Sequence, residues 1–374
     1  MATATKERPA KGKARGGITL ATDALKRALV AVRSAVGGMA KPVLQNVYIG
    51  SGVVEATDLE LRISCEIDYH EKPVLLPHQR LTAIMSAAGS AEELALQIGD
   101  TSCTLAIGSG RWTLPTEPVS EFPAYAVDEG SRKPVARIPA DQFARAVKAV
   151  AYACDNESSR YALGGVLVEV KDGTATFVAT DGRRLSRVDV EIDQAVDDTA
   201  TLWPSRAINV VAGIAGHSDG AVQLESAGNE LIATIDGTVV AGRVLDGRFP
   251  KWRDVFPERD AKATAVSRNE LLAATRQAAI VTSEQSKGVL FAITADGIHL
   301  TARSSEAGES SVTCPHLEFG QAATVSLDPA FVCDFLRACD DGEPVEIEAV
   351  DAQSAVVLRC GDYHGVIMPL AAEG

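Results

Sequence analysis

Two aspartates, Asp58 and Asp181, stand in matching Ala-Thr-Asp segments and are the side chains whose setting most directly suggests chemistry. A carboxylate pair can hold metal ions for phosphodiester hydrolysis, but the two ions of such a site lie about 4 Å apart. Both segments occupy corresponding positions of a repeat that runs through the chain, and corresponding positions of separate domains are much farther apart than that. A metal-dependent phosphodiesterase is therefore an alternative that the sequence argues against.

The other reactive side chains form no recognisable catalytic or metal-binding pattern. The six histidines are scattered, and the sequence has neither a zinc-protease helix, nor a phosphate-binding P-loop, nor a nucleophile elbow. The cysteines are odd in number and include no Cys-x-x-Cys pair, which favours reduced and mostly buried thiols. We therefore predict no catalytic residue, no metal and no cofactor. The seven cysteines are Cys65, Cys103, Cys154, Cys314, Cys333, Cys339 and Cys360.

The elements that would position these residues occur three times, at a period of about 120 residues. The first half of each repeat has a β-type run, a polar helix-cap region and an amphipathic helix of about four turns. These halves read GITLATDALKRALVAVRSAVG from Gly17, VARIPADQFARAVKAVAYACD from Val135 and ATAVSRNELLAATRQAAIVTS from Ala263. The second halves, PVLLPHQRLTAIMSAAG, TATLWPSRAINVVAGIAG and AATVSLDPAFVCDFLRACD, each contain a further helix. The chain is therefore predicted to hold six helices.

Between the helices, apolar residues alternate at period two, as in GGVLVEV and TATFVATD, which predicts antiparallel strands joined by tight turns. The predicted fold class is α+β, with three repeated domains that each pack two helices on antiparallel sheets. Linkers rich in proline, glycine and charge, PAYAVDEGSRKP and VFPERDAK, separate the repeats. We place the domains at residues 17–132, 133–257 and 258–374, after an N-terminal segment at 1–16.

The composition is that of an ordinary globular protein, with 46% hydrophobic and 23% charged residues. Residues 1–16 are basic and lack the apolar stretch of a signal peptide, and no run in the chain approaches the ~18 apolar residues of a membrane span. We interpret the first residues as a disordered basic tail on a cytoplasmic protein.

Positive charge is concentrated on the predicted helices although the net charge of the chain is −14. Most helix carboxylates stand near the N-termini, where the helix dipole favours them, and the strands and loops hold most of the others. A solvated polar face explains this for any single helix, but its recurrence in all three repeats predicts one basic surface on an acidic protein. The basic helix residues are Lys26, Arg27, Arg33, Arg80, Arg145, Lys148, Arg206, Arg276 and Arg337.

Four segments in a fixed order resemble the bacterial DNA polymerase III beta subunit, the sliding clamp family. They are KPVLQNVYIG followed by ATDLE, VATDGRRLS, LDGRFPKWRDVFP and the near-terminal VIMPL, and the resemblance spans residues 17–370. It implies a non-catalytic processivity factor of DNA replication, made as a head-to-tail homodimer that closes a ring of six domains. The helices would line the hole and face duplex DNA without reading its sequence. Arg160 and Tyr161 would add DNA contacts at one rim.

The resemblance also implies a hydrophobic pocket for short motifs of the DNA polymerase III alpha subunit, the clamp loader and other replication and repair proteins. Aliphatic walls with one thioether suit varied peptide anchors. Without the resemblance, ordinary core residues would be the preferred interpretation. The pocket would use Leu163, Thr180, Gly182, Arg183, Arg184, Leu185, Pro250, Val255, Val366, Ile367, Met368, Pro369 and Leu370.

The resemblance implies that ring closure brings Trp112 and Leu114, on an edge strand of one copy, against Ile280 and Val281, at a helix end of the other. Arg111 would pair with Glu306 or Glu309.

The chain departs from the family pattern at Arg183, where many members have His, at Asp254, where a basic residue is frequent, and in four extra residues, Ala371 to Gly374. The alternative function is a diverged, clamp-like scaffold that has lost its replicative partners.

Overall fold

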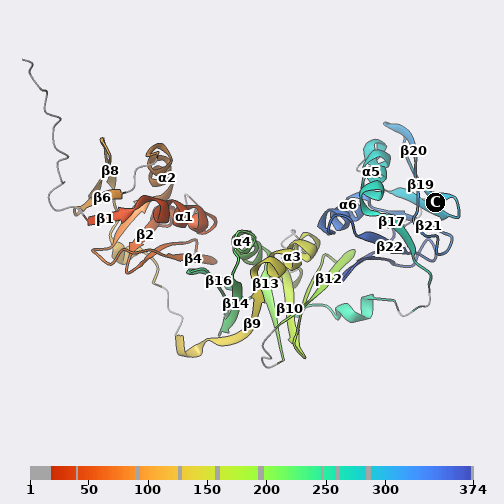
Figure 1. Ribbon diagram of the computed structural model, residues 1–374, viewed down its shortest axis with the longest axis horizontal. Helices are drawn as coiled ribbons and strands as arrows, with labels where there is room; N and C mark the ends of the chain where they lie inside the picture. Colours follow the sequence, from red (N-terminus) through yellow and green to blue (C-terminus); the bar gives the residue numbers. More distant parts are fainter. Residues whose placement is uncertain are drawn as a thin grey trace, which may run out of the picture. The chain divides into compact units, whose positions relative to one another are not determined.

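The computed structural model describes residues 18–38, 41–89, 93–124, 129–155, 161–192, 198–245, 247–257, 259, 261–283 and 288–371. Within them, one order of ten elements occurs three times: strand, helix, four strands, helix, three strands (Figure 1). The predicted tail at 1–16 lies outside the described residues.

The bounds of the elements are as follows. The first repeat contains β1 (Ile18–Ala21), α1 (Thr22–Val32), β2 (Asn46–Gly50), β3 (Val53–Thr57), β4 (Leu61–Glu66), β5 (Val74–Pro77), α2 (His78–Ala87), β6 (Glu93–Ile98), β7 (Ser102–Ile107) and β8 (Gly110–Pro115). The second contains β9 (Lys133–Pro139), α3 (Ala140–Val150), β10 (Gly165–Lys171), β11 (Thr174–Thr180), β12 (Arg184–Glu191), β13 (Thr199–Pro204), α4 (Ser205–Ala215), β14 (Ala221–Ala227), β15 (Glu230–Ile235) and β16 (Thr238–Arg243). The third contains β17 (Thr264–Ser267), α5 (Arg268–Ala278), β18 (Val289–Thr294), β19 (Gly297–Ser304), β20 (Gly308–Cys314), β21 (Ala323–Leu327), α6 (Pro329–Ala338), β22 (Pro344–Glu348), β23 (Val356–Cys360) and β24 (Tyr363–Ile367).

The six predicted helices are all present, and each buries an apolar stripe as the 3.6-residue periodicity requires. In α3, for example, Phe143, Val147 and Val150 are buried, and the Phe143 ring meets Phe177 of β11 edge-on at 5.7 Å. A polar cap was expected before the first helix of each repeat, and this holds for α5, where the Ser267 side chain accepts from the Glu270 N–H; the Asp328 side chain caps α6 in the same way.

That expectation is wrong for α1 and α3, and α2 and α4 also lack a side-chain cap. The residue before α2, α3 and α4 is a proline, and α1 follows Ala21. In each case a strand runs directly into the helix, so the proline ends an extended segment, as its fixed φ favours, and the first helical N–H groups receive no side-chain cap.

The chain forms two compact units, each with its own core. Unit 1 holds residues up to Ala126 together with Gly237–Val239, and unit 2 holds Val127–Asp236 and Val240–Gly374. In unit 1 the strand orders are β1-β6-β7-β8 and β5-β2-β3-β4. The Glu66 N–H at the end of β4 donates to the Gly237 carbonyl at 2.9 Å.

Unit 2 contains an eight-stranded antiparallel sheet in the order β13-β10-β11-β12-β24-β23-β22-β17. Its two halves come from the second and third repeats and are joined where β12 pairs with β24, from Arg184 opposite Ile367 to Val188 opposite Tyr363. A four-stranded sheet in the order β20-β19-β18-β21 completes the third repeat. The largest fully buried side chains of unit 2 include Trp203, Phe143, Phe177 and Phe335.

All seven cysteines are free and buried, as predicted. Among the described residues, no helix is both long and apolar enough to cross a membrane.

Candidate functional site

The side chains of Thr180 and Asp181 form hydrogen bonds with backbone groups of the turn between β11 and β12 and so fix its shape. The Thr180 hydroxyl donates to the Arg184 carbonyl at 2.6 Å and accepts from the Gly182 N–H. Asp181 Oδ1 accepts from the N–H groups of Arg183 and Arg184, both at 2.9 Å. Gly182 has φ +87°, a left-handed conformation that a glycine adopts without a Cβ penalty. The turn therefore presents the side chains of Arg183 and Arg184 from a fixed backbone.

Arg184, one of the predicted pocket residues, is committed to contacts inside the protein. Its side chain is 13% exposed; Nε lies 3.0 Å from Asp181 Oδ2 and Nη1 lies 2.8 Å from Asp334 Oδ2 of α6. Nη2 donates to the Tyr152 carbonyl at 2.7 Å, and the guanidinium lies 4.4 Å from the centre of the Phe331 ring. It therefore ties the second repeat to the third.

The segment after β24 runs along this turn. The Met368 N–H donates to the Arg183 carbonyl at 2.9 Å, and the Leu370 N–H donates to the Ser326 carbonyl of β21 at 2.9 Å. Pro369, between them, has no N–H to satisfy. Met368 is 44% exposed, so the segment is held by its backbone while the thioether points to solvent.

The remaining predicted pocket residues divide into a buried floor and an exposed rim. Leu163, Thr180, Leu185, Val366 and Ile367 are buried. Pro250 and Val255 are exposed, and Pro369 and Leu370 are half-buried. Leu185 and Val366 belong to an apolar cluster with Leu167, Val178, Leu202, Trp252 and Val357. The structure thus brings the predicted residues of both repeats together in unit 2.

Sequence reasoning missed several residues that hold this region in place. Tyr152 lies under Arg184, and its hydroxyl contacts the Ser186 and Tyr363 hydroxyls. Burial raises the pKa of both tyrosine hydroxyls, so they remain protonated donors near neutral pH. Trp252 donates from Nε1 to Glu169 at 3.1 Å and anchors the short helix Trp252–Val255 that carries Val255. Trp252 and Ser186 stand in segments that carried the family resemblance and Tyr152 in the first half of the second repeat, whereas Tyr363 stands in no segment that the sequence had singled out.

The basic residues assigned to the helices lie at exposed positions, except Lys26, which is half-buried and donates to the Gly89 carbonyl at 2.8 Å. Two of them have carboxylate partners: Arg145 lies 3.3 Å from Asp340, and Arg337 lies 2.8 Å from Asp334. Arg160 lies outside the described residues. The exposed members are Arg27, Arg33, Arg80, Arg145, Lys148, Arg206, Arg276 and Arg337.

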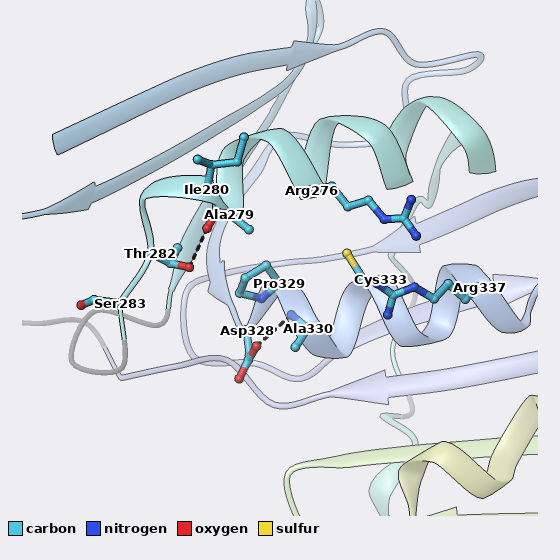
Figure 2. A pocket seen from close by; sticks show the side chains of 10 residues that line it. All are labelled: Arg276, Ala279, Ile280, Thr282, Ser283, Asp328, Pro329, Ala330, Cys333 and Arg337. Atoms are coloured by element: carbon cyan, nitrogen blue, oxygen red, sulfur yellow. Dashed lines mark hydrogen bonds between the residues drawn. The ribbon is translucent and has the colours of Figure 1, made fainter. Parts of the chain in front are cut away.

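A cavity of about 380 Å³ lies between α5 and α6. It is lined both by residues predicted to face DNA and by a residue predicted to lie in the dimer interface. Figure 2 shows Arg276 of α5 and Arg337 of α6 on its walls, with Cys333 between the helices. Ile280, assigned to ring closure, stands at its other end and is 78% exposed. A candidate DNA-facing surface and a candidate interface are therefore neighbours on this repeat.

The residues predicted for ring closure lie on the edge strand β8, on the short helix Ala279–Val281 that follows α5, and on or just before the edge strand β20. Trp112 and Leu114 alternate with exposed residues on β8, which pairs with β7 alone among the described strands. Val281 is half-buried beside Ile280. Glu309, on the edge strand β20, already pairs with Arg303 of its own protomer at 2.8 Å, whereas Glu306 and Arg111 are exposed.

Asp58 and Asp181 serve equivalent turns. Asp58 Oδ1 accepts from the N–H groups of Glu60 and Leu61, as Asp181 does from Arg183 and Arg184. Among the described residues, no group of three or more His, Cys, Asp or Glu side chains is placed to hold a metal ion.

Comparison with known proteins decides the family. A family model described as the central domain of the DNA polymerase III beta subunit matches residues 137–251, and one for its C-terminal domain matches residues 253–370. The chain belongs to the DNA polymerase III beta-subunit family of sliding clamps. The expected resemblance is therefore confirmed. Because members of this family are non-catalytic processivity factors, the family also supports the view that the chain is not an enzyme.

Curated relatives and solved structures agree with this membership. The chain is 26% identical to the beta sliding clamp of Chlamydia muridarum over 350 residues, covering 88% of this chain and 91% of the relative. It is 23% identical to that of Escherichia coli K12 over 359 residues, covering 91% and 98%. The DNA polymerase III beta subunit of Pseudomonas aeruginosa superposes with a TM-score of 0.85 at 24% identity, covering 94% of this chain and 99% of that one. The Bacillus subtilis sliding clamp gives 0.87 at 18%, covering 95% and 99%. The predicted α+β fold is confirmed.

Proposed function

We propose that two copies of this chain close a ring around duplex DNA and tether the DNA polymerase III alpha subunit, the clamp loader and other replication proteins in the bacterial cytoplasm. The observation that carries the proposal is that, among the described strands, β8 and β20 are free sheet edges although their counterparts in unit 2, β24 and β12, are paired with each other. Each repeat contributes two groups of four strands, and corresponding groups are paired in the same order in all three repeats. In unit 2, the outer strand β12 of one group pairs antiparallel with the outer strand β24 of the next. Pairing β20 with β8 of a second copy would repeat that joint.

Two such joints would form a closed head-to-tail dimer, because each copy offers one edge of each kind. Within this proposal, the repeats are domains at 17–132, 133–257 and 258–374. Apolar burial by Trp112, Leu114, Ile280 and Val281 would supply most of the interface energy. Exposed ion pairs would add about 1 kcal/mol or less each. Arg111 would have to compete with Arg303 for Glu309, so Glu306 is its better partner.

Sedimentation tests the ring joint directly. Ile280→Ala/Val281→Ala should be monomeric at concentrations where the wild type is dimeric, since it removes exposed apolar area without touching a buried side chain. An exposed residue on another face, Val30→Ala on α1, is the matched control and should leave the dimer unchanged. A dimer that survives the double substitution contradicts the joint.

DNA contact in this proposal comes from the exposed helix arginines and lysines, with Tyr161 and Arg160 at one rim. Association with linear duplex should be weak, independent of sequence and salt-sensitive, with a log-log slope of about −0.9 per phosphate neutralised. Retention on circular DNA should far exceed retention on the same DNA once it is linearised, because a ring is held by topology. Equal retention on both forms would overturn encirclement.

The same proposal assigns partner binding to the surface around Leu185 and Met368. Deleting everything from Val366 is too severe a test, because Val366 and Ile367 are buried and paired in β24. A chain ending at Ile367 removes Met368, Pro369 and Leu370 and leaves the strand in place. It should lose polymerase and loader subunits in a pull-down while remaining dimeric, whereas removing only residues 371–374 should do little or tighten binding. A wild-type ring that binds DNA but captures neither subunit would favour the scaffold alternative.

A further inference from the structure

Two buried cysteines lie next to each other in the third repeat, where the end of α6 meets β23. Cys339 follows α6 directly, one turn beyond Phe335. Cys360 ends β23 and pairs with Tyr363 of β24. The rings of Phe335 and Tyr363 stack with their centres 4.3 Å apart. Because each cysteine adjoins one member of this stacked pair, the fold itself brings the two thiols together.

The two thiols hydrogen-bond each other, and this contact makes them chemically unequal. It lowers the pKa of Cys360, against the effects of burial and of the carboxylates of Glu343 and Asp340, and the Asp340 backbone adds a further hydrogen bond that lowers it. The same contact, together with burial, raises the pKa of Cys339, whose Sγ also donates to the Phe335 carbonyl at 3.3 Å. One thiol therefore loses its proton more readily while its neighbour keeps its own, which is the arrangement that a dithiol needs to form a disulfide.

The pair is buried close to the surface of the third repeat. Cys339 is 3% exposed and Cys360 is 6% exposed, but the residues that follow each of them, 340–344 and 361–362, are exposed. A small local opening of these two turns is enough to admit a molecule of the size of hydrogen peroxide. Cys333 is buried on the same helix and offers a comparison, because burial and charged side chains, rather than a second thiol, shift its pKa.

We propose that Cys339 and Cys360 form a reversible redox-modification site, which hydrogen peroxide converts into a disulfide within one chain. The Cys360 thiolate attacks one peroxide oxygen, the O–O bond breaks, and the departing hydroxide takes up the proton that Cys360 has lost. The Cys339 sulfur then attacks the resulting sulfenic acid. The S–S bond forms, the S–O bond breaks, and the second hydroxide leaves with the Cys339 proton. Two thiols are thus oxidised by two electrons, and one peroxide is reduced to two waters.

The modification adds a covalent link to a protein whose proposed function is binding alone. It would tie the end of α6 to β23 and close the segment 340–359 into a loop. Thiol–disulfide exchange with an excess of a small dithiol reverses it. Disulfides of this reversible kind are the usual ones in reducing compartments.

Thiol counting on the reduced, full-length protein tests the proposal. After treatment with hydrogen peroxide the protein is denatured, alkylated with iodoacetamide and weighed intact. Two of the seven thiols should resist alkylation, and all seven should react once dithiothreitol has been added. Trypsin cuts after Arg337 and Arg359, which places the two cysteines in separate peptides, 338–359 and 360–374, that should be recovered as one linked species. Non-reducing electrophoresis should show single chains.

Single substitutions assign the two roles. In Cys339→Ser the Cys360 sulfenic acid has no thiol to react with, so dimedone should trap it, whereas Cys360→Ser should give much less adduct at Cys339. Cys333→Ala is the matched control and should yield the same linked peptides as the wild type. The wild-type thiol count requires no substitution, so it decides the question for a variant that fails to fold as well.

The contrary results are equally plain. The proposal is overturned if all seven thiols stay free at peroxide concentrations that fully oxidise glutathione, or if the linked peptides join any other cysteines. It is also overturned if the oxidised protein unfolds at a lower temperature than the reduced one. A disulfide between thiols that the fold has already placed together restricts the unfolded chain without straining the native one.

Discussion

The turn from β3 to β4 and the turn from β11 to β12 are held by the same hydrogen bonds but present side chains of different chemistry. In both, a threonine hydroxyl donates four residues ahead and the next residue, an aspartate, receives two backbone N–H groups. The first turn then carries Leu59, Glu60 and Leu61, where the second carries Gly182, Arg183 and Arg184. A shared Thr-Asp frame therefore fixes the turn, and the three residues after it decide what the turn presents.

The difference extends to what lies beside each turn in its own unit. Leu61 is buried by apolar packing, whereas Arg184 reaches Asp334 and Tyr152 and is stabilised by charge and hydrogen bonds. Leu59 has φ +82°, a conformation that costs a leucine roughly 1–2 kcal/mol, whereas Gly182 adopts φ +87° freely. The second turn has the unstrained backbone and the polar anchor, as expected of a turn that positions a binding surface.

The largest expected effect comes from giving the second turn the side chain of the first. Arg184→Leu should lower the free energy of unfolding of unit 2 by about 3 kcal/mol, because Oδ2 of each of two partly buried carboxylates and the Tyr152 carbonyl lose the donor that Arg184 supplies. Urea unfolding followed by tryptophan fluorescence measures it, since Trp203 and Trp252 both lie in this unit.

A second substitution distinguishes the ion pair from simple loss of packing. Asp334→Asn alone should destabilise, but added to Arg184→Leu it should cost less than it does alone, because the contact between Arg184 and Asp334 Oδ2 is already lost and only the contact with Arg337 remains to be weakened. Arg183→Leu, next to it and without an ion pair to any described residue, is the control and should change stability by about 0.5 kcal/mol or less. Strictly additive effects would contradict a coupled pair.

The second-largest expected effect comes from substituting the residue that adopts a positive φ in each turn, Gly182 in one and Leu59 in the other. Gly182→Ala should destabilise by about 1 kcal/mol, because an alanine pays the left-handed penalty that glycine avoids. Leu59→Gly should instead stabilise unit 1 by about 0.5 kcal/mol, since relief of strain outweighs the greater freedom of glycine in the unfolded chain. Thermal unfolding of both variants measures this. Equal changes of one sign would show that the two turns are not strained differently.

Sequence periodicity predicted the repeat, the six helices and the antiparallel strands, because these depend on neighbouring residues. It also found the two Ala-Thr-Asp segments and argued against a metal pair there, but it did not predict that each aspartate accepts two backbone N–H groups. It could not assign the role of Arg184, since Asp334 is 150 residues away and nothing local marks the two as partners. The same holds for Tyr152 and Tyr363, which are 211 residues apart in sequence and meet only once the sheet forms across β12 and β24.

The smallest expected effect is the pH dependence of the stability of unit 2. It arises at the pairing of β12 with β24, which places the C-terminal segment beside the second turn. His364 of β24 lies opposite Arg187 of β12 and Arg359 of β23. Burial and these two arginines lower its pKa, while Asp189 and Asp362 act the other way. The folded protein thus binds this proton less readily than the unfolded chain.

The resulting stability is complete above the usual histidine pKa of about 6.5 and is lost as pH falls through the lowered value. We expect unit 2 to lose stability as pH falls below about 6.5, by less than Gly182→Ala costs, and His364→Gln to abolish that slope. NMR titration of the ring should give a pKa below that of a histidine in a short peptide; a raised value would reverse the predicted slope.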